Sequence, residues 1–167
     1  SRKDAGQWMI TPTPIHLDAE VRAVVTETTL IAQRKGIDLQ MGPNPPLPQA
    51  LADAGRVQQV ARNLIINATK FTPRGGHIWV SVEADANWVT LKVADTGIGI
   101  PEDLLPQIWR RFYRVPQHKS FDVTGRGLGL AIVQIIAKAH GSLPNVQSEV
   151  GKGTTFTVSF PRADRGA

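Results

Sequence analysis

Residues 78–99 read IWVSVEADANWVTLKVADTGIG and contain two alternating apolar runs joined by a short polar turn. The inward members of the two runs are Ile78, Val80, Val82, Val89, Leu91 and Val93. Alternation with a period of two predicts half-buried strands, and the turn Asp85-Ala86-Asn87 predicts that they pair as a hairpin. The second strand runs directly into a glycine-rich loop.

Three segments with helical periodicity surround this hairpin. They are residues 17–35, 54–71 and 127–140. Asp53 is a suitable N-cap for the second helix, and Gly36 and Gly141 are suitable stops for the first and third. Each segment has an apolar stripe that predicts one buried face.

The remaining segments predict short strands and one short helix. Strands are expected at residues 37–41, 50–52 and 154–160, with a strand and turn between 146 and 150. Pro101 suits the first turn of a short helix, and no helix start is recognisable in residues 7–14. Hairpins mixed with helices predict an α+β sandwich with a mostly antiparallel sheet.

Composition limits the classes of function. The 167 residues suit one domain, and the chain has no cysteine, which excludes disulfides and thiolate metal sites. No apolar run is long enough to span a bilayer and no signal peptide is recognisable, so a soluble piece is expected, and the lack of cysteine fits a reducing compartment such as the cytoplasm. The net charge is +5, but only Arg110, Arg111 and Arg114 cluster. We therefore expect an acidic small ligand or protein partner and no nucleic acid.

Asn63, Asn67 and Lys70 are spaced by four and three residues, and so share one face of the expected second helix. Asparagine is unfavourable in the middle of a helix, yet two occur one turn apart. Amide oxygens are suitable ligands for Mg²⁺, and a lysine ammonium is suitable for phosphate. Taken alone, this pattern is equally compatible with a solvated helix surface.

Asp95-Thr96-Gly97-Ile98-Gly99-Ile100-Pro101 ends the hairpin and is the first of two glycine loops. An ionised carboxylate only accepts hydrogen bonds, so Asp95 suits the exocyclic amine of adenine and would repel the carbonyl oxygen of guanine. Such a bond contributes about 1.5–3 kcal/mol, roughly a tenfold to hundredfold preference for ATP over GTP. The alternative is an ordinary Asp-Gly turn.

The second loop, Gly125-Arg126-Gly127-Leu128-Gly129, leads into the third expected helix. Backbone N–H groups at a helix N-terminus bind anions, although a flexible hinge is the alternative. No Walker A loop is present, because no Gly-Lys-Ser/Thr follows. Between the loops, the aromatic and basic segment 108–114 suits either anchoring of a mobile loop with Arg114 on a phosphate, or a partner-binding patch.

Together these motifs resemble the catalytic ATP-binding domain of bacterial two-component sensor histidine kinases, a family shared with DNA gyrase, mismatch-repair ATPases and ATP-dependent chaperones. The N box corresponds to residues 63–71, the two glycine boxes to 95–99 and 125–129, and the F box to 111–114. Residues 151–156, GKGTTF, resemble the last turn of the family. The resemblance implies a two-layer sandwich with about three helices on one face of the sheet.

The resemblance also implies domain boundaries and residue roles. Residues 1–13 would be a linker, 14–161 the catalytic domain with an ATP lid at about 101–126, and 162–167 a tail. Mg²⁺ would be held by Asn67 assisted by Asn63, and these two, with Lys70 and Arg114, would be the catalytic residues. ATP would be bound by Asn67, Lys70, Phe71, Asp95, Gly97, Gly99, Ile100, Tyr113, Arg114, Arg126, Gly127, Leu128, Gly129 and Thr155.

Three features depart from the family pattern. Phe71 replaces the common tyrosine and Arg126 replaces a threonine or serine. The phosphoacceptor context is missing around all four histidines, which are His16, His77, His118 and His140. The resemblance therefore implies transfer to a histidine on separate dimerisation helices and a response regulator receiver domain as partner, with a monomeric isolated domain and a homodimeric full-length protein. The alternatives are a non-catalytic nucleotide-binding module and a gyrase-type or mismatch-repair-type ATPase clamp.

Overall fold

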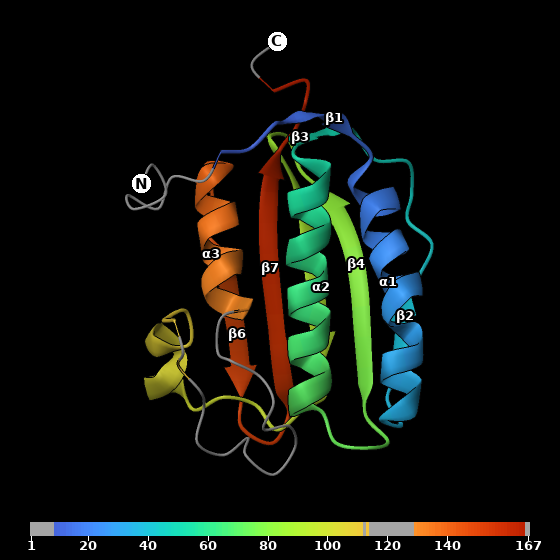
Figure 1. Ribbon diagram of the computed structural model, residues 1–167, viewed down its shortest axis with the longest axis vertical. Coiled ribbons are helices and arrows are strands. Elements are labelled where there is room, and N and C mark those ends of the chain that lie inside the picture. The colour runs from blue at the N-terminus through green and yellow to red at the C-terminus, as the bar shows by residue number, and fades with distance from the viewer. Residues whose placement is uncertain (1–8, 112, 114–128, 166–167) are drawn as a thin grey trace.

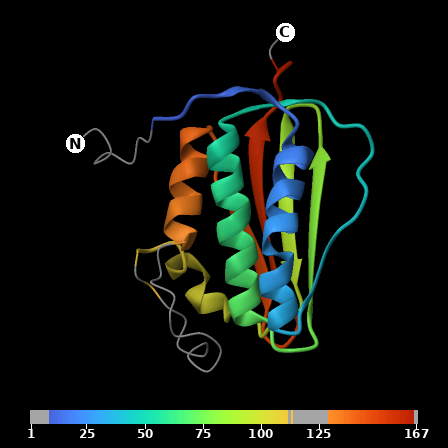
Figure 2. The ribbon, with the colours of Figure 1, turned by 45° about the vertical axis from the view of Figure 1, so that its right-hand side comes forward.

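The computed structural model describes residues 9–111, 113 and 129–165. Three α-helices of the described chain lie side by side on one face of a sheet (Figures 1 and 2). They are α1 (Leu17–Arg34), α2 (Ala54–Phe71) and α3 (Gly129–Ala139). The expected two-layer α+β sandwich is confirmed.

The sheet has five strands in the order β2-β4-β5-β7-β6. Their bounds are β2 (Asp38–Met41), β4 (His77–Ala84), β5 (Trp88–Asp95), β7 (Gly153–Pro161) and β6 (Asn145–Glu149). β2 pairs with β4 in parallel and the other neighbours are antiparallel, so the sheet is mixed and mostly antiparallel as predicted. In the predicted hairpin, Val80 lies opposite Val93 and Val82 opposite Leu91.

The core lies between the helices and the sheet. Among its largest fully buried side chains are Phe160, Leu17, Leu64, Ile65, Ile78, Leu91 and Ile136. Asp53 caps α2 as expected, because its carboxylate accepts a hydrogen bond from the Arg56 N–H at 3.2 Å. Alternate residues of β5 face the core, and this alternation brings Asp95 to the inner face at the end of the strand.

A second, two-stranded sheet is not predicted from the sequence. β1 (Thr13–Ile15) pairs antiparallel with β3 (Ala50–Ala52), with Pro14 opposite Leu51. The prediction of β3 is confirmed, and no helix starts in the described part of residues 7–14, but the sequence does not predict the strand β1. A strand of three residues around a proline is too short to show an alternating apolar pattern, so β1 forms because it pairs with β3, which lies far along the chain.

The segments around the glycine loops agree with the prediction where they are described. The short helix after Pro101 is the 3₁₀ helix η2 (Glu102–Gln107). The third helix, predicted from residue 127, begins at Gly129, and residues 127 and 128 lie outside the described residues. No helix in the described chain is long and apolar enough to cross a membrane.

Candidate nucleotide site

Asp95 is the buried acid at the end of β5, with 8% of its surface exposed. Its Oδ1 accepts two backbone hydrogen bonds, from the Gly97 N–H at 2.8 Å and the Thr154 N–H at 3.2 Å. Within the described chain, no donor bonds to its Oδ2. The carboxylate is therefore fixed through one oxygen and keeps acceptor capacity on the other.

Burial raises the pKa of Asp95 to about 6, against the lowering effect of the two backbone hydrogen bonds. Desolvation disfavours the ionised form, and two N–H donors compensate only part of that cost. A buried acid that titrates close to neutral pH is typical of a functional site. A hydrogen-bond donor on a ligand would favour the ionised form.

The first glycine loop packs against the end of α2. The Ile98 N–H donates to the Phe71 carbonyl oxygen at 3.0 Å. At Gly97 a Cβ would collide with the same carbonyl and would lie 2.8 Å from Oδ1 of Asp95, so a side chain does not fit there. Of the predicted site residues, Gly97 therefore lies in direct contact with both the Phe71 backbone and the Asp95 side chain.

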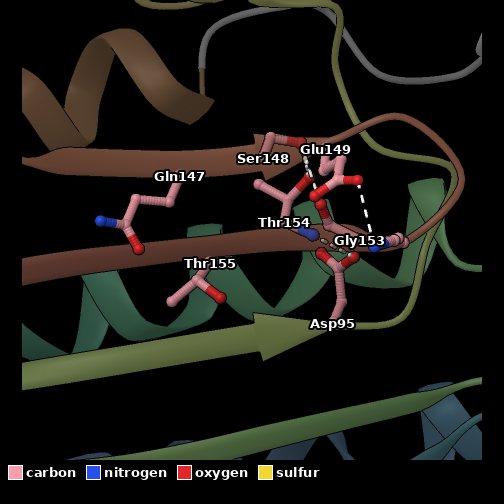
Figure 3. Close-up of a pocket in the computed structure, with 8 residues that line it drawn as sticks. Asp95, Gln147, Ser148, Glu149, Gly153, Thr154 and Thr155 are labelled. Carbon is pink, nitrogen blue, oxygen red and sulfur yellow. Dashed lines mark hydrogen bonds and ion pairs between the residues drawn. The ribbon is translucent and has the colours of Figure 1, made fainter.

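The end of β6, the start of β7 and the turn between them lie next to Asp95. Together with Asp95, residues of these segments line an open hollow of about 310 Å³ (Figure 3). The lining residues are Asp95, Gln147, Ser148, Glu149, Lys152, Gly153, Thr154 and Thr155. Of the predicted residues, the hollow thus includes Asp95 and Thr155, whereas Asn63, Asn67 and Lys70 do not line it.

Both predicted asparagines, Asn63 and Asn67, lie on α2 and are half-buried. The Asn63 Nδ2 donates to the Gly129 carbonyl oxygen at 3.2 Å, which joins α2 to the start of α3. The Asn67 Nδ2 is buried and has no hydrogen-bond partner among the described residues. A buried amide without a partner is costly, so Asn67 is a candidate for contact with a ligand.

The other predicted residues occupy varied positions. Lys70 is half-buried in the last turn of α2, and no described carboxylate pairs with it. Ile100 is buried in the core at 2% exposure, and Tyr113 packs against the core. The backbone of Gly99 passes close to that of Glu149, so a Cβ at position 99 would collide with the Glu149 carbonyl oxygen. Predictions for Phe112, Arg114, Gly125, Arg126, Gly127, Leu128 and His118 lie outside the described residues.

Several polar residues that line the hollow are not predicted from the sequence, and two of them, Ser148 and Thr154, are hydrogen-bonded to each other. Thr154 is 6% exposed and lies directly opposite Asp95, whereas Thr155 is half-buried on the other face of β7. The alternation in β7 could have predicted that Thr154 is buried, because Thr154 shares the period of the buried Phe156, Val158 and Phe160. No comparable signal marks Ser148.

Comparison with known families agrees with this geometry. The family model described as "Histidine kinase-, DNA gyrase B-, and HSP90-like ATPase" matches residues 52–164. The chain belongs to this ATPase family, and the resemblance drawn from its motifs is confirmed.

Its relatives include sensor histidine kinases. The chain is 42% identical over 136 residues to the aerobic respiration control sensor protein ArcB of Escherichia coli K12, covering 80% of this chain and 17% of ArcB. It is 32% identical over its whole length to the uncharacterized sensor-like histidine kinase R01002 of Rhizobium meliloti, of which it spans 32%. The chain thus spans at most about a third of these two relatives.

Solved structures share the fold. Full-length ShkA in complex with AMPPNP superposes with a TM-score of 0.81 at 32% identity, covering 96% of this chain and 33% of that one. The nucleotide-free catalytic domain of histidine kinase ThkA has a TM-score of 0.80 at 26% identity, covering 92% of this chain and 97% of that one. The fold is therefore that of a histidine kinase catalytic domain.

Proposed function

We propose that this chain binds Mg·ATP and transfers the γ-phosphoryl group to a histidine on a separate dimerisation domain. The observation that carries this proposal is the buried Asp95 carboxylate, with Oδ1 bonded to two backbone N–H groups. An ionised carboxylate only accepts hydrogen bonds, so it suits the amino group of adenine, whereas guanine would present a carbonyl oxygen at the same position. The complex of the similar ShkA with AMPPNP supports the same ligand class.

The residues on α2 fit a magnesium ion. The described residues contain no group of three His, Cys, Asp or Glu side chains that could hold a metal. Because the Asn63 Nδ2 is bonded to Gly129, its amide oxygen is left available for a cation. The Asn67 Nδ2, which has no partner among the described residues, is a donor that suits a phosphate oxygen, so the ion would be held by the amide oxygen of Asn67. We infer that Asn67, assisted by Asn63, would hold Mg²⁺, which would neutralise charge on the phosphates.

Phosphoryl transfer depends mainly on positioning and charge neutralisation. Lys70 would contact the phosphates from α2 and Arg114 from the lid at about 101–126. Gly127 and Gly129 would let the second glycine loop close over the triphosphate, and Arg126 would either add a phosphate contact or alter closure of the lid. In the reaction, the bond from the γ-phosphorus to the bridging oxygen breaks, a phosphorus–nitrogen bond forms to the acceptor imidazole, and ADP leaves. We assign no residue of this chain as the base that takes the proton of the acceptor imidazole.

Two of the three described histidines, His77 and His140, are engaged in contacts that suit structural roles, whereas His16 is exposed and makes no side-chain cap bond to α1. His140 is buried, with Nδ1 against the Ile136 carbonyl oxygen at 2.8 Å and Nε2 accepting the Asp53 N–H at 3.1 Å. His77 is exposed and lies 3.3 Å from the Asp38 carboxylate. These contacts argue against His77 and His140 as acceptors, and the sequence around all four histidines lacks the phosphoacceptor context.

The wider assembly follows from this proposal. We infer that residues 14–161 form the catalytic domain, with 1–13 as the linker to a phosphoacceptor hairpin and 162–167 as a tail. The isolated domain would be a monomer, and the full-length kinase would be a cytoplasmic or membrane-anchored homodimer that passes phosphate to a receiver domain.

A transfer assay tests the proposal. The chain is incubated with γ-labelled ATP, Mg²⁺ and a separately purified phosphoacceptor hairpin, and acid-labile label on the hairpin is measured. Label that depends on the chain and on Mg²⁺ is expected. Tight ATP binding without any transfer would favour a nucleotide-binding module, and steady ATP hydrolysis without transfer would favour an ATPase clamp.

A further inference from the structure

Ser148, Thr154 and Asp95 form one row across the strands β6, β7 and β5. Thr154 lies directly opposite Ser148 on one side and directly opposite Asp95 on the other. Side chains of directly paired residues point to the same face of a sheet. Because Thr154 and Asp95 are buried, this is the face covered by the helices.

The Ser148 hydroxyl has a complete set of hydrogen-bond partners. Its Oγ lies 2.8 Å from the Ile100 N–H donor, 3.0 Å from the Gly153 carbonyl oxygen and 2.7 Å from the Thr154 hydroxyl. A hydroxyl donates once and accepts twice. Ile100 and Thr154 can therefore donate to Ser148 while Ser148 donates to Gly153, and all three contacts are satisfied together.

These bonds close a ring around the first glycine loop. The loop leaves the sheet at Asp95 and reaches Ile100, whose N–H returns to Ser148 at the edge strand. Ser148 contacts the Thr154 side chain, and the Thr154 N–H donates to Oδ1 of Asp95. Figure 3 shows Ser148, Thr154 and Asp95 converging at the end of the strands.

We propose that Ser148 is a positioning residue for the adenine-reading carboxylate of Asp95. By fixing both the exit of the loop and Thr154, its hydroxyl keeps Oδ1 on the backbone donors and leaves Oδ2 for the adenine amine. This inference rests on the proposed adenine site. It makes nucleotide selectivity depend on a serine that does not touch the base.

The test compares three variants of the full chain. Ser148→Ala removes the hydroxyl and leaves the Ile100 N–H without its partner. Ser148→Thr keeps a hydroxyl in a strand and serves as the rescue variant. Ser159→Ala is the matched control, because it removes a hydroxyl from the same sheet whose partner is Thr90, on the face away from the helices.

The measurements are affinities for ATP and GTP by calorimetry, and the titration of the Asp95 carboxyl by NMR. For Ser148→Ala we expect the ratio of ATP to GTP affinity to fall about tenfold, the equivalent of one lost hydrogen bond. The pKa of Asp95 should rise further, since the Thr154 donor that lowers it is loosened. Ser148→Thr should restore both values, and Ser159→Ala should change neither.

Each other result has a defined meaning. Equal loss of ATP and GTP affinity in Ser148→Ala, or an unchanged pKa of Asp95, would overturn the positioning role and leave Ser148 as a structural residue. Failure of the proposed function would appear separately, as unchanged ATP affinity in Asp95→Asn. Loss of ATP affinity in Asp95→Asn together with unchanged selectivity in Ser148→Ala would therefore refute this inference alone.

Discussion

The Thr154 N–H donates a 3.2 Å hydrogen bond to Oδ1 of Asp95, which lies 59 residues earlier in the chain. The Gly97 N–H donates to the same oxygen at 2.8 Å. Two donors on one oxygen prevent the carboxylate from rotating freely, so the orientation of Asp95 is decided by β7 and by the glycine loop together. The site therefore depends on contacts that are formed only when the sheet is complete.

We expect Asp95→Asn to abolish nucleotide binding without unfolding the domain. The amide oxygen can keep both backbone bonds, but its NH₂ group would then face the adenine amine, which is also a donor. A loss of more than about a hundredfold is expected in calorimetry with Mg·ATP. Asp85→Asn, in the exposed hairpin turn, should bind ATP normally. Unchanged affinity in Asp95→Asn would contradict the adenine assignment.

Asn67→Ala should weaken ATP binding mainly when Mg²⁺ is present. The amide oxygen is proposed to hold the ion, so its removal should cost roughly tenfold in affinity with Mg²⁺ and little in EDTA. Asn145→Ala, on the exposed edge strand, is the matched control. An equal loss with and without Mg²⁺ would identify Asn67 as a structural residue.

Stability should depend on pH through Asp95. Its pKa is raised by burial from 3.8 to about 6, so the folded state binds the proton more tightly than the unfolded state. The free energy of unfolding should therefore fall as pH rises from about 4 to about 6, by on the order of 3 kcal/mol, and then level off. Urea unfolding of the wild type and of Asp95→Asn at pH 5 and 7.5 isolates this contribution.

The wild type should lose stability relative to Asp95→Asn between these two pH values. A constant difference would mean that Asp95 is ionised throughout, with an unperturbed pKa.

Gly97→Ala should destabilise the loop, because its Cβ would collide with the Phe71 carbonyl oxygen and approach Oδ1 of Asp95. We expect a decrease of about 1–3 kcal/mol in the free energy of unfolding, together with weaker ATP binding. Gly42→Ala is the control, since nothing lies within 4 Å of a Cβ at that position. Equal stability of the two variants in thermal unfolding would refute the close packing of the loop.

Much of the fold is readable from local patterns. The alternation in residues 78–99 predicts the β4–β5 hairpin, and the spacing of apolar residues predicts α1 and α2 within about one residue of their observed bounds. These elements are readable because burial of one face imposes a period of 2 on strands and 3.6 on helices. β1 has no such period, since it is short and contains Pro14.

The candidate site is only partly readable from the sequence. Asp95 and the spacing of Asn63 and Asn67 are recognisable because their chemistry is unusual in their local context. Ser148 is an ordinary serine in an edge strand, and only its contacts with Ile100 and Thr154 mark it as part of the site. A side chain whose role is to hold another residue leaves no local signal.

The sequence by itself therefore determined the elements, the α+β class and the chemistry of the glycine loop, because each depends on residues close together in the chain. Only the tertiary structure decided the strand order β2-β4-β5-β7-β6 and the parallel pairing of β2. It also decided the convergence of Asp95, Ser148 and Thr154. Such relationships depend on which distant segments bury their apolar faces together, and short-range periodicity does not specify that choice.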